Sequence, residues 1–244
     1  ELIVLRHGPR KMPVLYTHLI PASFGGRARM NVANALAAAA AAWSMGAHIH
    51  DIRQGLRTFS TSFFQAPGRL NLVEVAGTRV IIDYCHNVDG MRQLADFVNR
   101  MMVEPQTRAG VLGAPAAPPR TGRAIGVIGI PGDRRDQDQR EYGALAATAF
   151  DEIVIREDRN LRGRQPGETA SNVAAGIRAA RGEAGRAVRV DKILDEASAV
   201  RAALRRSAPG DLVVVCADDA VDVYRQAMAL AGRTQGGTAF ADPG

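Results

Sequence analysis

The feature that most constrains the fold is an alternation of short apolar runs with longer amphipathic segments, from residue 78 to residue 231. The run at 78–84 is rich in β-branched residues and has Asp83 near its end; His86 and Asn87 follow it, and a helical pattern then begins. Strands that alternate with helices of this length predict an α/β fold with a doubly wound, mostly parallel sheet. A preceding run at 70–75 is separated from it only by Ala76-Gly77, which predicts a hairpin and one antiparallel edge strand.

The same alternation predicts the remaining elements of this part of the chain. Further strands are expected at 124–130, 152–156, 187–190 and 211–216, and helices at 89–102, 137–150, 168–181, 192–206 and 220–231. Residues 104–123 are rich in Pro, Gly and Ala. They indicate a surface insertion rather than a domain linker, because the alternation resumes directly afterwards.

The first 66 residues have a different pattern. Residues 1–20 alternate loosely around a His-Gly-Pro-Arg-Lys turn, which predicts a pair of strands, and 21–26 is a loop. An Ala-rich segment at 27–45 predicts a helix, and a second short helix is expected at 49–56. Pro67-Gly68-Arg69 interrupts the pattern. We therefore expect the end of one α/β domain at 1–66, a second domain at 67–232, and a flexible tail at 233–244.

Composition restricts what the chain binds. Aromatic residues make up only 5%, the net charge is +6, and all but two of the 31 basic residues are arginine. Two interpretations stay open: the bias of a proteome rich in Ala, Arg and Gly, or a site for phosphates or carboxylates, which arginine grips bidentately. Nucleic-acid binding is not expected, because acids are interleaved with the arginines and few aromatics are available for stacking.

The two cysteines indicate the compartment. Cys85 and Cys216 each end an apolar run without metal-ligand spacing, which predicts buried thiols in a reducing compartment and no metal site. No apolar run approaches the ~20 residues of a membrane span, so we expect a cytoplasmic protein without a membrane partner. The chain begins at Glu1 rather than Met, and we interpret it as a piece of a longer protein.

Polar side chains follow three of the expected strands. They are Asp83, His86 and Asn87; Asp133, Arg134, Arg135 and Asp136; and Glu157, Asp158, Arg162 and Arg164. Because the carboxyl ends of parallel strands share one sheet edge, the three clusters should converge there. The turn at 129–132 could offer N–H groups to an anion. Taken alone, a turn of this kind often has no binding role, and His86 would more often be a structural histidine than a base. Together the clusters predict a ligand site.

Some motifs are ambiguous and others are missing. Asn31 and Asn34 share a face of the Ala-rich helix, where capping or solvent exposure explains them as well as binding does. A phosphate loop of the type GxxxxGK[ST] needs a lysine, and neither Lys11 nor Lys192 stands in that context. HExxH, GxSxG and paired-cysteine patterns do not occur. The residues suit part of a nucleotide but lack the usual lysine for its β- and γ-phosphates.

Four segments, taken in order, resemble the Mur ligase superfamily and, within it, the cyanophycin synthetase family. They are GGRARMNVANALAA at 25–38, Pro67-Gly68-Arg69, DYCHNVDG at 83–90 and PGDRRD at 131–136. The polar segment at 156–168 favours cyanophycin synthetases over the peptidoglycan and folate ligases. The resemblance extends from about residue 18 to 230.

The resemblance implies an ATP-dependent amide ligase, in which a carboxylate is activated as an acyl phosphate and then attacked by an amine. For this family the carboxylate is the β-carboxylate of a poly-aspartate backbone, and the amine is that of arginine. The implied cofactors are ATP and Mg²⁺, the partners a cyanophycin primer and arginine, and the assembly a homo-oligomer. Residues 1–66 would end the central, ATP-binding domain, and 67–232 would form the carboxyl-terminal ligase domain.

The resemblance also implies roles for individual residues. Asn31 and Asn34 would contact the adenine side, Arg69 and Asp83 the ribose and phosphates, and His86 and Asn87 would shape the site. Asp83, His86 and Arg69 are the implied catalytic residues. The loops that carry Asp133, Arg134 and Arg135, and Glu157, Asp158, Arg162 and Arg164, would face the amine substrate. The carboxylates Asp133, Glu157 and Asp158 would suit a guanidinium.

Departures from the family pattern keep alternatives open. Cys85 and Val88 stand where the family usually has Ala and Pro, and Ile130 where it often has Gly. The family's phosphate loop lies upstream, in the central domain. If the full-length protein has that loop, this chain supplies half of a ligase site and is inactive alone. Alternatively, it is a degenerate module that serves as a scaffold or binds polymer, or a Mur-type ligase for another acid and amine.

Overall fold

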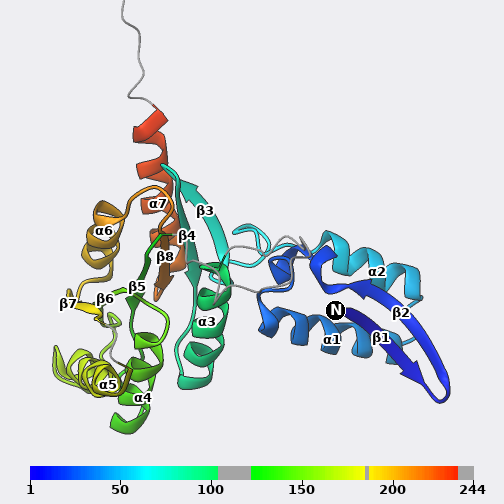
Figure 1. Ribbon diagram of the computed structural model, residues 1–244, viewed down its shortest axis with the longest axis horizontal. Helices are drawn as coiled ribbons and strands as arrows, with labels where there is room; N and C mark the ends of the chain where they lie inside the picture. Colours follow the sequence, from blue (N-terminus) through cyan, green and yellow to red (C-terminus); the bar gives the residue numbers. More distant parts are fainter. Residues whose placement is uncertain (104–121, 185–186, 236–244) are drawn as a thin grey trace, which may run out of the picture. The chain divides into compact units, whose positions relative to one another are not determined.

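The computed structural model describes residues 1–103, 122–184 and 187–235 (Figure 1). The chain forms two compact units, Glu1–Ala66 and Pro67–Gly244. The insertion predicted at 104–123 lies almost entirely outside the described residues. In the described ranges, no helix has the length and apolarity that crossing a bilayer requires.

The first unit is a hairpin with two helices. Strands β1 (Leu2–His7) and β2 (Arg10–Tyr16) pair antiparallel, which confirms the predicted strand pair. Two short 3₁₀ turns, η1 (Thr17–Leu19) and η2 (Pro21–Ser23), lead to helices α1 (Arg29–Ser44) and α2 (Ile49–Thr58). The strands are joined at Gly8, whose φ of +60° suits a residue without Cβ.

A small apolar core joins these elements. Its buried members come from both strands, the turns and both helices: Ile3, Val14, Leu15, Ile20, Ala22, Ala35, Ala39 and Ile52. Arg53 adds a polar tie, because its guanidinium donates to the carbonyl oxygens of Pro13 (2.5 Å) and Val14 (3.0 Å). Helix α2 is thereby attached to β2.

The second unit contains a six-stranded sheet in the order β3-β4-β8-β5-β6-β7. The strands are β3 (Asn71–Val75), β4 (Thr78–Asp83), β5 (Ala124–Ile128), β6 (Glu152–Ile155), β7 (Arg189–Lys192) and β8 (Leu212–Cys216). Strand β3 pairs antiparallel with β4, and every other neighbouring pair is parallel. The predicted mostly parallel α/β sheet with an antiparallel edge strand is confirmed.

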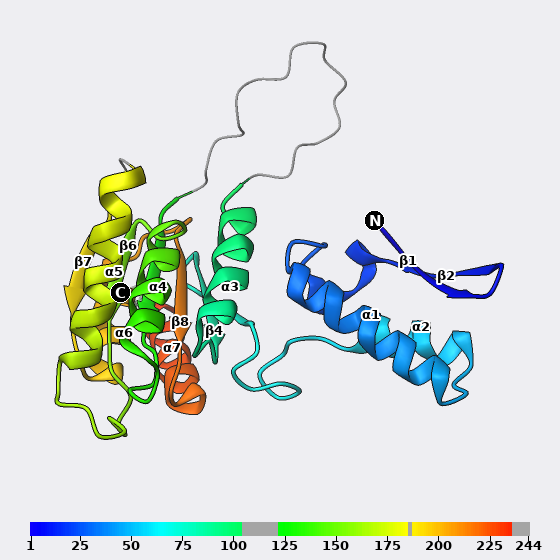
Figure 2. The same ribbon diagram turned by 90° about the horizontal axis from the view of Figure 1, so that it is seen from below.

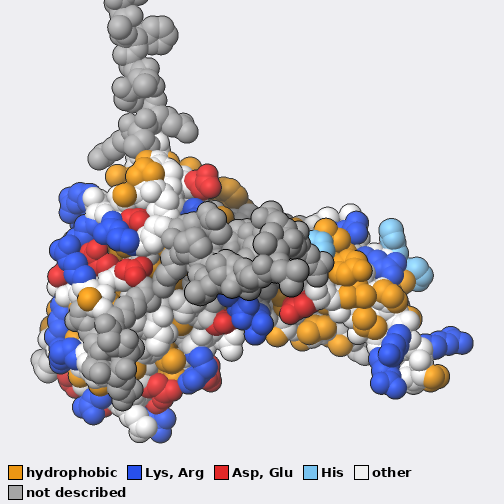
Figure 3. All heavy atoms as spheres, viewed as in Figure 1, with side chains coloured by type: hydrophobic (Ala, Val, Ile, Leu, Met, Phe, Trp, Pro, Cys, Tyr) orange, Lys and Arg blue, Asp and Glu red, His pale blue; other side chains and the backbone are white. Residues whose placement is uncertain are grey.

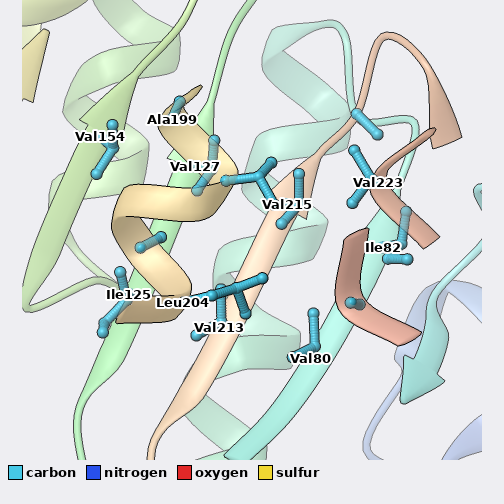
Figure 4. Packing of buried hydrophobic residues seen from close by; sticks show 14 of the residues in the cluster. Val80, Ile82, Ile125, Val127, Val154, Ala199, Leu204, Val213, Val215 and Val223 are labelled. Carbon is cyan, nitrogen blue, oxygen red and sulfur yellow. The ribbon is translucent and has the colours of Figure 1, made fainter. Parts of the chain in front are cut away.

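Helices cover both faces of this sheet. They are α3 (Val88–Met101), α4 (Asp136–Ala147), α5 (Glu168–Ala184), α6 (Glu196–Arg206) and α7 (Ala220–Gln235). Ile125 and Val127 pack with residues of α6 and α7 around the central strand β8 (Figure 4). Gly126, between them, faces the Phe150 ring at the end of α4 instead. Because alternate residues of a strand point to opposite faces, α4 covers the other side, with α3 and α5 beside it (Figure 2).

Several boundaries differ from the sequence-based expectation, among them those of β7, α6 and α7. Strand β7 lies two residues later than predicted, at Arg189–Lys192, because its pairing with β6 selects a polar edge segment over the apolar residues before it. Helix α6 begins at Glu196 rather than 192, because the Asp195 carboxylate accepts from the Ser198 N–H (2.8 Å) and caps the helix. Helix α7 continues to Gln235, so the tail predicted from residue 233 is helical at its start.

Helices α4 and α5 approach unusually closely through two glycines. A Cβ at Gly143 would overlap the carbonyl oxygen of Val173, and one at Gly176 would overlap that of Arg140. These are backbone atoms, which cannot rotate aside as the end of a side chain can. The contact between the two helices therefore depends on the absence of a side chain at both positions.

The change Gly176→Ala should lower the free energy of unfolding by about 2–3 kcal/mol, because the methyl group must push the two helices apart. Gly55→Ala in helix α2 is the matched control, since its Cβ would meet nothing within 4 Å. It should leave stability unchanged or raise it by up to about 1 kcal/mol. Urea unfolding of both variants measures this, and equal effects from both would contradict the packing argument.

Candidate functional site

The carboxyl ends of β4, β8, β5 and β6 lie along one edge of the sheet, because these adjacent strands are parallel. The three polar clusters predicted from the sequence follow β4, β5 and β6. Strand β8 lies between the first and the second cluster, so its own end also belongs to this edge. The predicted convergence of the clusters on one sheet edge is therefore confirmed.

A tight turn before β3 is tied to the end of β4. The Gly68 carbonyl accepts from the Tyr84 N–H (2.8 Å), and the Gly68 N–H donates to Asn71 Oδ1 (2.6 Å). Leu70 has a φ of +49°, a left-handed conformation that an apolar residue rarely adopts. In that conformation its N–H donates to Asp83 Oδ2 (3.1 Å). The strained turn thus presents a backbone donor to Asp83.

Asp83 is a carboxylate at this edge whose pKa is raised by burial. Burial raises its pKa above the ordinary value, while the Leu70 N–H and the charges of Arg69 and His86 oppose the rise. The net effect is upward because desolvation is the largest contribution. A cation or a hydrogen-bond donor that binds beside Asp83 would therefore favour its ionised form.

Arg69 places a cation next to Asp83 without pairing closely with it. Its guanidinium carbon lies 6.0 Å from the centre of the Tyr84 ring, a cation–π distance. Within the described ranges no carboxylate lies at ion-pair distance from Arg69. Its donors are therefore available to an anion.

His86 and Asn87 serve the local structure. The Tyr84 carbonyl lies 2.9 Å from His86 Nδ1, which donates to it, and the other ring nitrogen, Nε2, faces Asn87. The Asn87 side-chain nitrogen lies 3.5 Å from that Nε2, and Asn87 Oδ1 accepts from the Gly90 N–H (2.7 Å). Asn87 is thus the N-cap of α3. The catalytic role predicted for His86 stays a prediction.

The loops after β5 and β6 are bound to each other. Arg164 donates to the carbonyl oxygens of Gly132 (2.8 Å) and Arg134 (3.0 Å), which lie in the β5 loop. It also pairs with Asp136 (2.7 Å) and with Glu168 (2.6 Å). The two predicted clusters are therefore brought together, with Arg164 as the connection between them.

Three other predicted arginines lie in these loops, each in a different environment. Arg162 pairs with Asp133 (3.0 Å), and both side chains are nearly half exposed. Arg135 pairs with Asp138 (2.7 Å) and is 80% exposed. Arg134 differs from them, because its Nε is buried without a hydrogen-bond partner. No carboxylate in the described chain pairs with it, so its guanidinium is a second cation available to a ligand.

Glu157 and Asp158 have structural roles that the sequence pattern did not reveal. Glu157 is only 6% exposed and accepts from the N–H groups of Gly167 (2.8 Å) and Ala170 (2.9 Å) at the start of α5. Asp158 forms an ion pair with the buried Arg156. Both carboxylates are engaged by these partners, and the substrate contact that the resemblance implies for them stays a prediction.

A buried ionic network behind the edge joins Asp158 to Arg156 and Glu196, two residues that were not predicted as part of the site. Arg156 is 3% exposed, pairs with Asp158 and with Glu196 (3.2 Å), and donates to the Cys216 carbonyl (2.6 Å). Glu196 in turn accepts from the N–H groups of Asp218 (2.6 Å) and Asp219 (2.9 Å) after β8. The network joins the ends of β6 and β8 to the start of α6. An arginine directly after a buried strand was its only sequence signal.

The two predicted asparagines lie in the first unit, on α1. Asn31 donates to the Ala22 carbonyl (2.7 Å), and Asn34 Nδ2 lies 3.4 Å from Asn31 Oδ1. Both line a mainly apolar pocket of about 570 Å³ between α1 and α2, together with Ile20, Ala35, Ile52 and Leu56. Their predicted contact with adenine stays a prediction. Within the described residues, no three His, Cys, Asp or Glu side chains are grouped so as to hold a metal ion.

Comparison with known proteins decides the family. Residues 68–218 match the family described as Mur ligase, glutamate ligase domain. This chain belongs to the Mur ligase family. The match covers the sheet, the turn before β3 and the loops after β4, β5 and β6.

Curated Mur ligase relatives narrow the group. The chain is 42% identical over 197 residues to cyanophycin synthetase of Synechocystis sp. (strain ATCC 27184 / PCC 6803 / Kazusa), covering 81% of this chain and 20% of that protein. It is 38% identical over 196 residues to cyanophycin synthetase of Crocosphaera subtropica (strain ATCC 51142 / BH68), with 80% and 20% covered. The chain thus spans about a fifth of the length of these relatives.

Solved structures support the Mur ligase fold. The bifunctional folylpolyglutamate synthase/dihydrofolate synthase of Yersinia pestis CO92 has a TM-score of 0.59 at 23% identity, with 93% of this chain and 43% of that one covered. The E. coli FolC complex with DHPP and ADP has a TM-score of 0.56 at 21% identity, with 82% and 39% covered. At these identities the likeness concerns the fold alone.

Proposed function

We propose that this chain is part of an ATP-dependent ligase of the cyanophycin synthetase type. In this proposal the β-carboxylate of a poly-aspartate backbone is activated as an acyl phosphate and joined to the α-amine of arginine. The 42% identity to a cyanophycin synthetase supports the assignment of the group. The observation that carries the proposal for this chain is that the buried Asp83, at the end of β4, lies within the electrostatic influence of Arg69, whose own donors are not taken by a carboxylate of the described residues.

Asp83 and Arg69 fit the two parts of a nucleotide. An ionised Asp83 would accept hydrogen bonds from ribose hydroxyls, beside the one it already accepts from Leu70. Arg69, free of a close carboxylate, would bind a phosphate bidentately. ATP, with Mg²⁺ on its phosphates, would supply the phosphoryl group that activates the acid.

The loops after β5 and β6 fit an arginine substrate. Asp133 already holds a guanidinium, that of Arg162, at 3.0 Å and near the surface. A substrate guanidinium could replace Arg162 there with the same geometry. Arg134, whose Nε has no partner, would neutralise the carboxylate of the incoming amino acid. These residues bind and orient the amine, and correct placement supplies much of the rate of an amide ligation.

A substrate screen with the full-length protein tests this function. With ATP, Mg²⁺ and a poly-aspartate primer, radiolabelled arginine should enter polymer at least about a hundredfold faster than lysine, glutamate or diaminopimelate. This chain alone should not hydrolyse ATP in response to arginine. Preferred incorporation of another amino acid would favour a different Mur-type ligase, and incorporation of none would favour a non-catalytic module.

A further inference from the structure

Positive charge is concentrated in the first unit. Residues 1–66 contain seven Lys and Arg residues but only two acids, Glu1 and Asp51, so they account for +5 of the chain's +6. The second unit, although rich in arginine, is nearly neutral because acids match its basic residues. The charge of the chain is therefore a local property of the smaller unit.

Three of these seven side chains, Arg6, Arg10 and Lys11, gather with His7 at the free end of the β1–β2 hairpin. Arg6, His7, Arg10 and Lys11 are all exposed. Arg6 lies directly opposite Lys11, and His7 directly opposite Arg10. Since directly opposed residues share a face of the ribbon, both faces of its end carry cations. Figure 3 shows blue Lys and Arg side chains at this end, with no red carboxylate among them.

This arrangement opposes folding of the hairpin. Like charges directly across an antiparallel pair are destabilising, and Arg6 and Lys11 form such a pair next to Arg10. Nothing in the described residues offsets them with a carboxylate, and Arg6 Nε is occupied only by the Gly8 carbonyl (3.2 Å). The hairpin is held from its other end, where Ile3 and Val14 enter the core. Its basic end is thus uncompensated within the unit and suited to an external anion.

The chemistry favours an acidic polypeptide over a nucleic acid. Arginine binds carboxylates through parallel N–H donors, whereas single-stranded nucleic acid is bound largely by stacking on aromatic rings. The hairpin end has no Phe, Tyr or Trp, and Tyr16, at the far end of β2, is stacked on His18 (5.5 Å between ring centres). We propose that Arg6, His7, Arg10 and Lys11 form a docking site for poly-aspartate. This rests on the proposed function, because it identifies the carboxylate polymer as that ligase's substrate.

Fluorescence anisotropy with labelled poly-L-aspartate, in the absence of ATP and arginine, tests the site on the 244-residue chain. The double change Arg10→Gln with Lys11→Gln should weaken binding about tenfold. The change Arg6→Glu should weaken it as much while creating a cross-strand ion pair with Lys11, so its melting temperature should not fall. The control, Arg57→Gln with Arg205→Gln, removes the same charge from exposed positions elsewhere and should change binding less than about twofold.

The outcomes separate this inference from the proposed ligase function. Unchanged binding in both hairpin variants, or an equal loss in the control, would overturn the docking site, even if the full-length protein incorporates arginine. Tighter binding of a single-stranded RNA through the same side chains would also overturn it. Conversely, binding needs no catalysis, so an inactive ligase would leave the expected anisotropy result unaltered.

Discussion

Replacing Asp83 by asparagine should reduce arginine incorporation by the full-length protein at least about a hundredfold. The substitution keeps an oxygen that can accept from Leu70 but removes the charge that would bind the ribose hydroxyls and stand opposite Arg69. The loss should appear in the initial rate of labelled-arginine incorporation and in nucleotide affinity. Asp89→Asn is the matched control, because the Asp89 side chain is 95% exposed and its ion pair with Arg92 is long, at 3.9 Å. This variant should leave the rate of incorporation unchanged.

The Asp83→Asn variant should lose activity, but it should not lose folding stability. Burial raises the pKa of Asp83 in the folded state, so the folded chain favours the protonated form more than the unfolded chain does. Ionised Asp83 therefore opposes folding above its folded-state pKa, and the neutral asparagine removes that penalty. At neutral pH the variant should be at least as stable as the natural chain. The difference in stability should shrink as the pH falls below the folded-state pKa of Asp83 and vanish below its ordinary, unfolded-state pKa. A destabilised variant would show that Asp83 holds the fold rather than a ligand.

Replacing Arg156 by methionine should lower the free energy of unfolding of the chain by about 3–5 kcal/mol. The change leaves Asp158 and Glu196 without their buried cation and the Cys216 carbonyl without its donor. Urea unfolding of the 244-residue chain measures the loss. Arg135→Met is the matched control, since Arg135 is 80% exposed and pairs only with Asp138, and it should cause no measurable change.

The Arg156 variant should also lose activity in the full-length protein before it unfolds, because the network positions the loops after β6 and β8. Replacing Arg156, Asp158 and Glu196 together by apolar residues would restore much of the stability, since a buried ionic group can often be exchanged for a well-packed apolar one. Equal stability of the Arg156→Met variant and the natural chain would contradict this role of the network.

The fold was largely predictable because local pattern and tertiary structure agree in the second unit. Buried parallel strands such as β8 are continuous apolar runs, and the two-residue turn Ala76-Gly77 predicts the hairpin of β3 and β4. Prediction failed where strand pairing or capping decides a boundary. Polar β7 is a strand only because β6 lies beside it, and α6 begins at the cap supplied by Asp195. The place of β8 between β4 and β5 has no local sequence signal.

The site was less predictable, because the hydrogen bonds and ion pairs of its side chains are made with residues far away in the sequence. The sequence pattern identified the polar residues at the strand ends, and Arg162 and Arg164 do contact the loop after β5. It could not show that Glu157 turns inward to the start of α5, or that Arg156 is buried between two acids. Nor could it show that burial raises the pKa of Asp83, since burial depends on how the folded chain packs around the carboxylate.

The proposed reaction activates the β-carboxylate of aspartate by phosphoryl transfer before arginine attacks it. A poly-aspartate primer labelled with ¹⁸O in the β-carboxylate of its acceptor residue tests this order of events in the full-length protein. An acyl phosphate passes one carboxylate oxygen to the departing phosphate, so one ¹⁸O is expected in the inorganic phosphate formed with each amide bond. Label in AMP, or amide bonds formed with unlabelled phosphate, would contradict the proposed reaction.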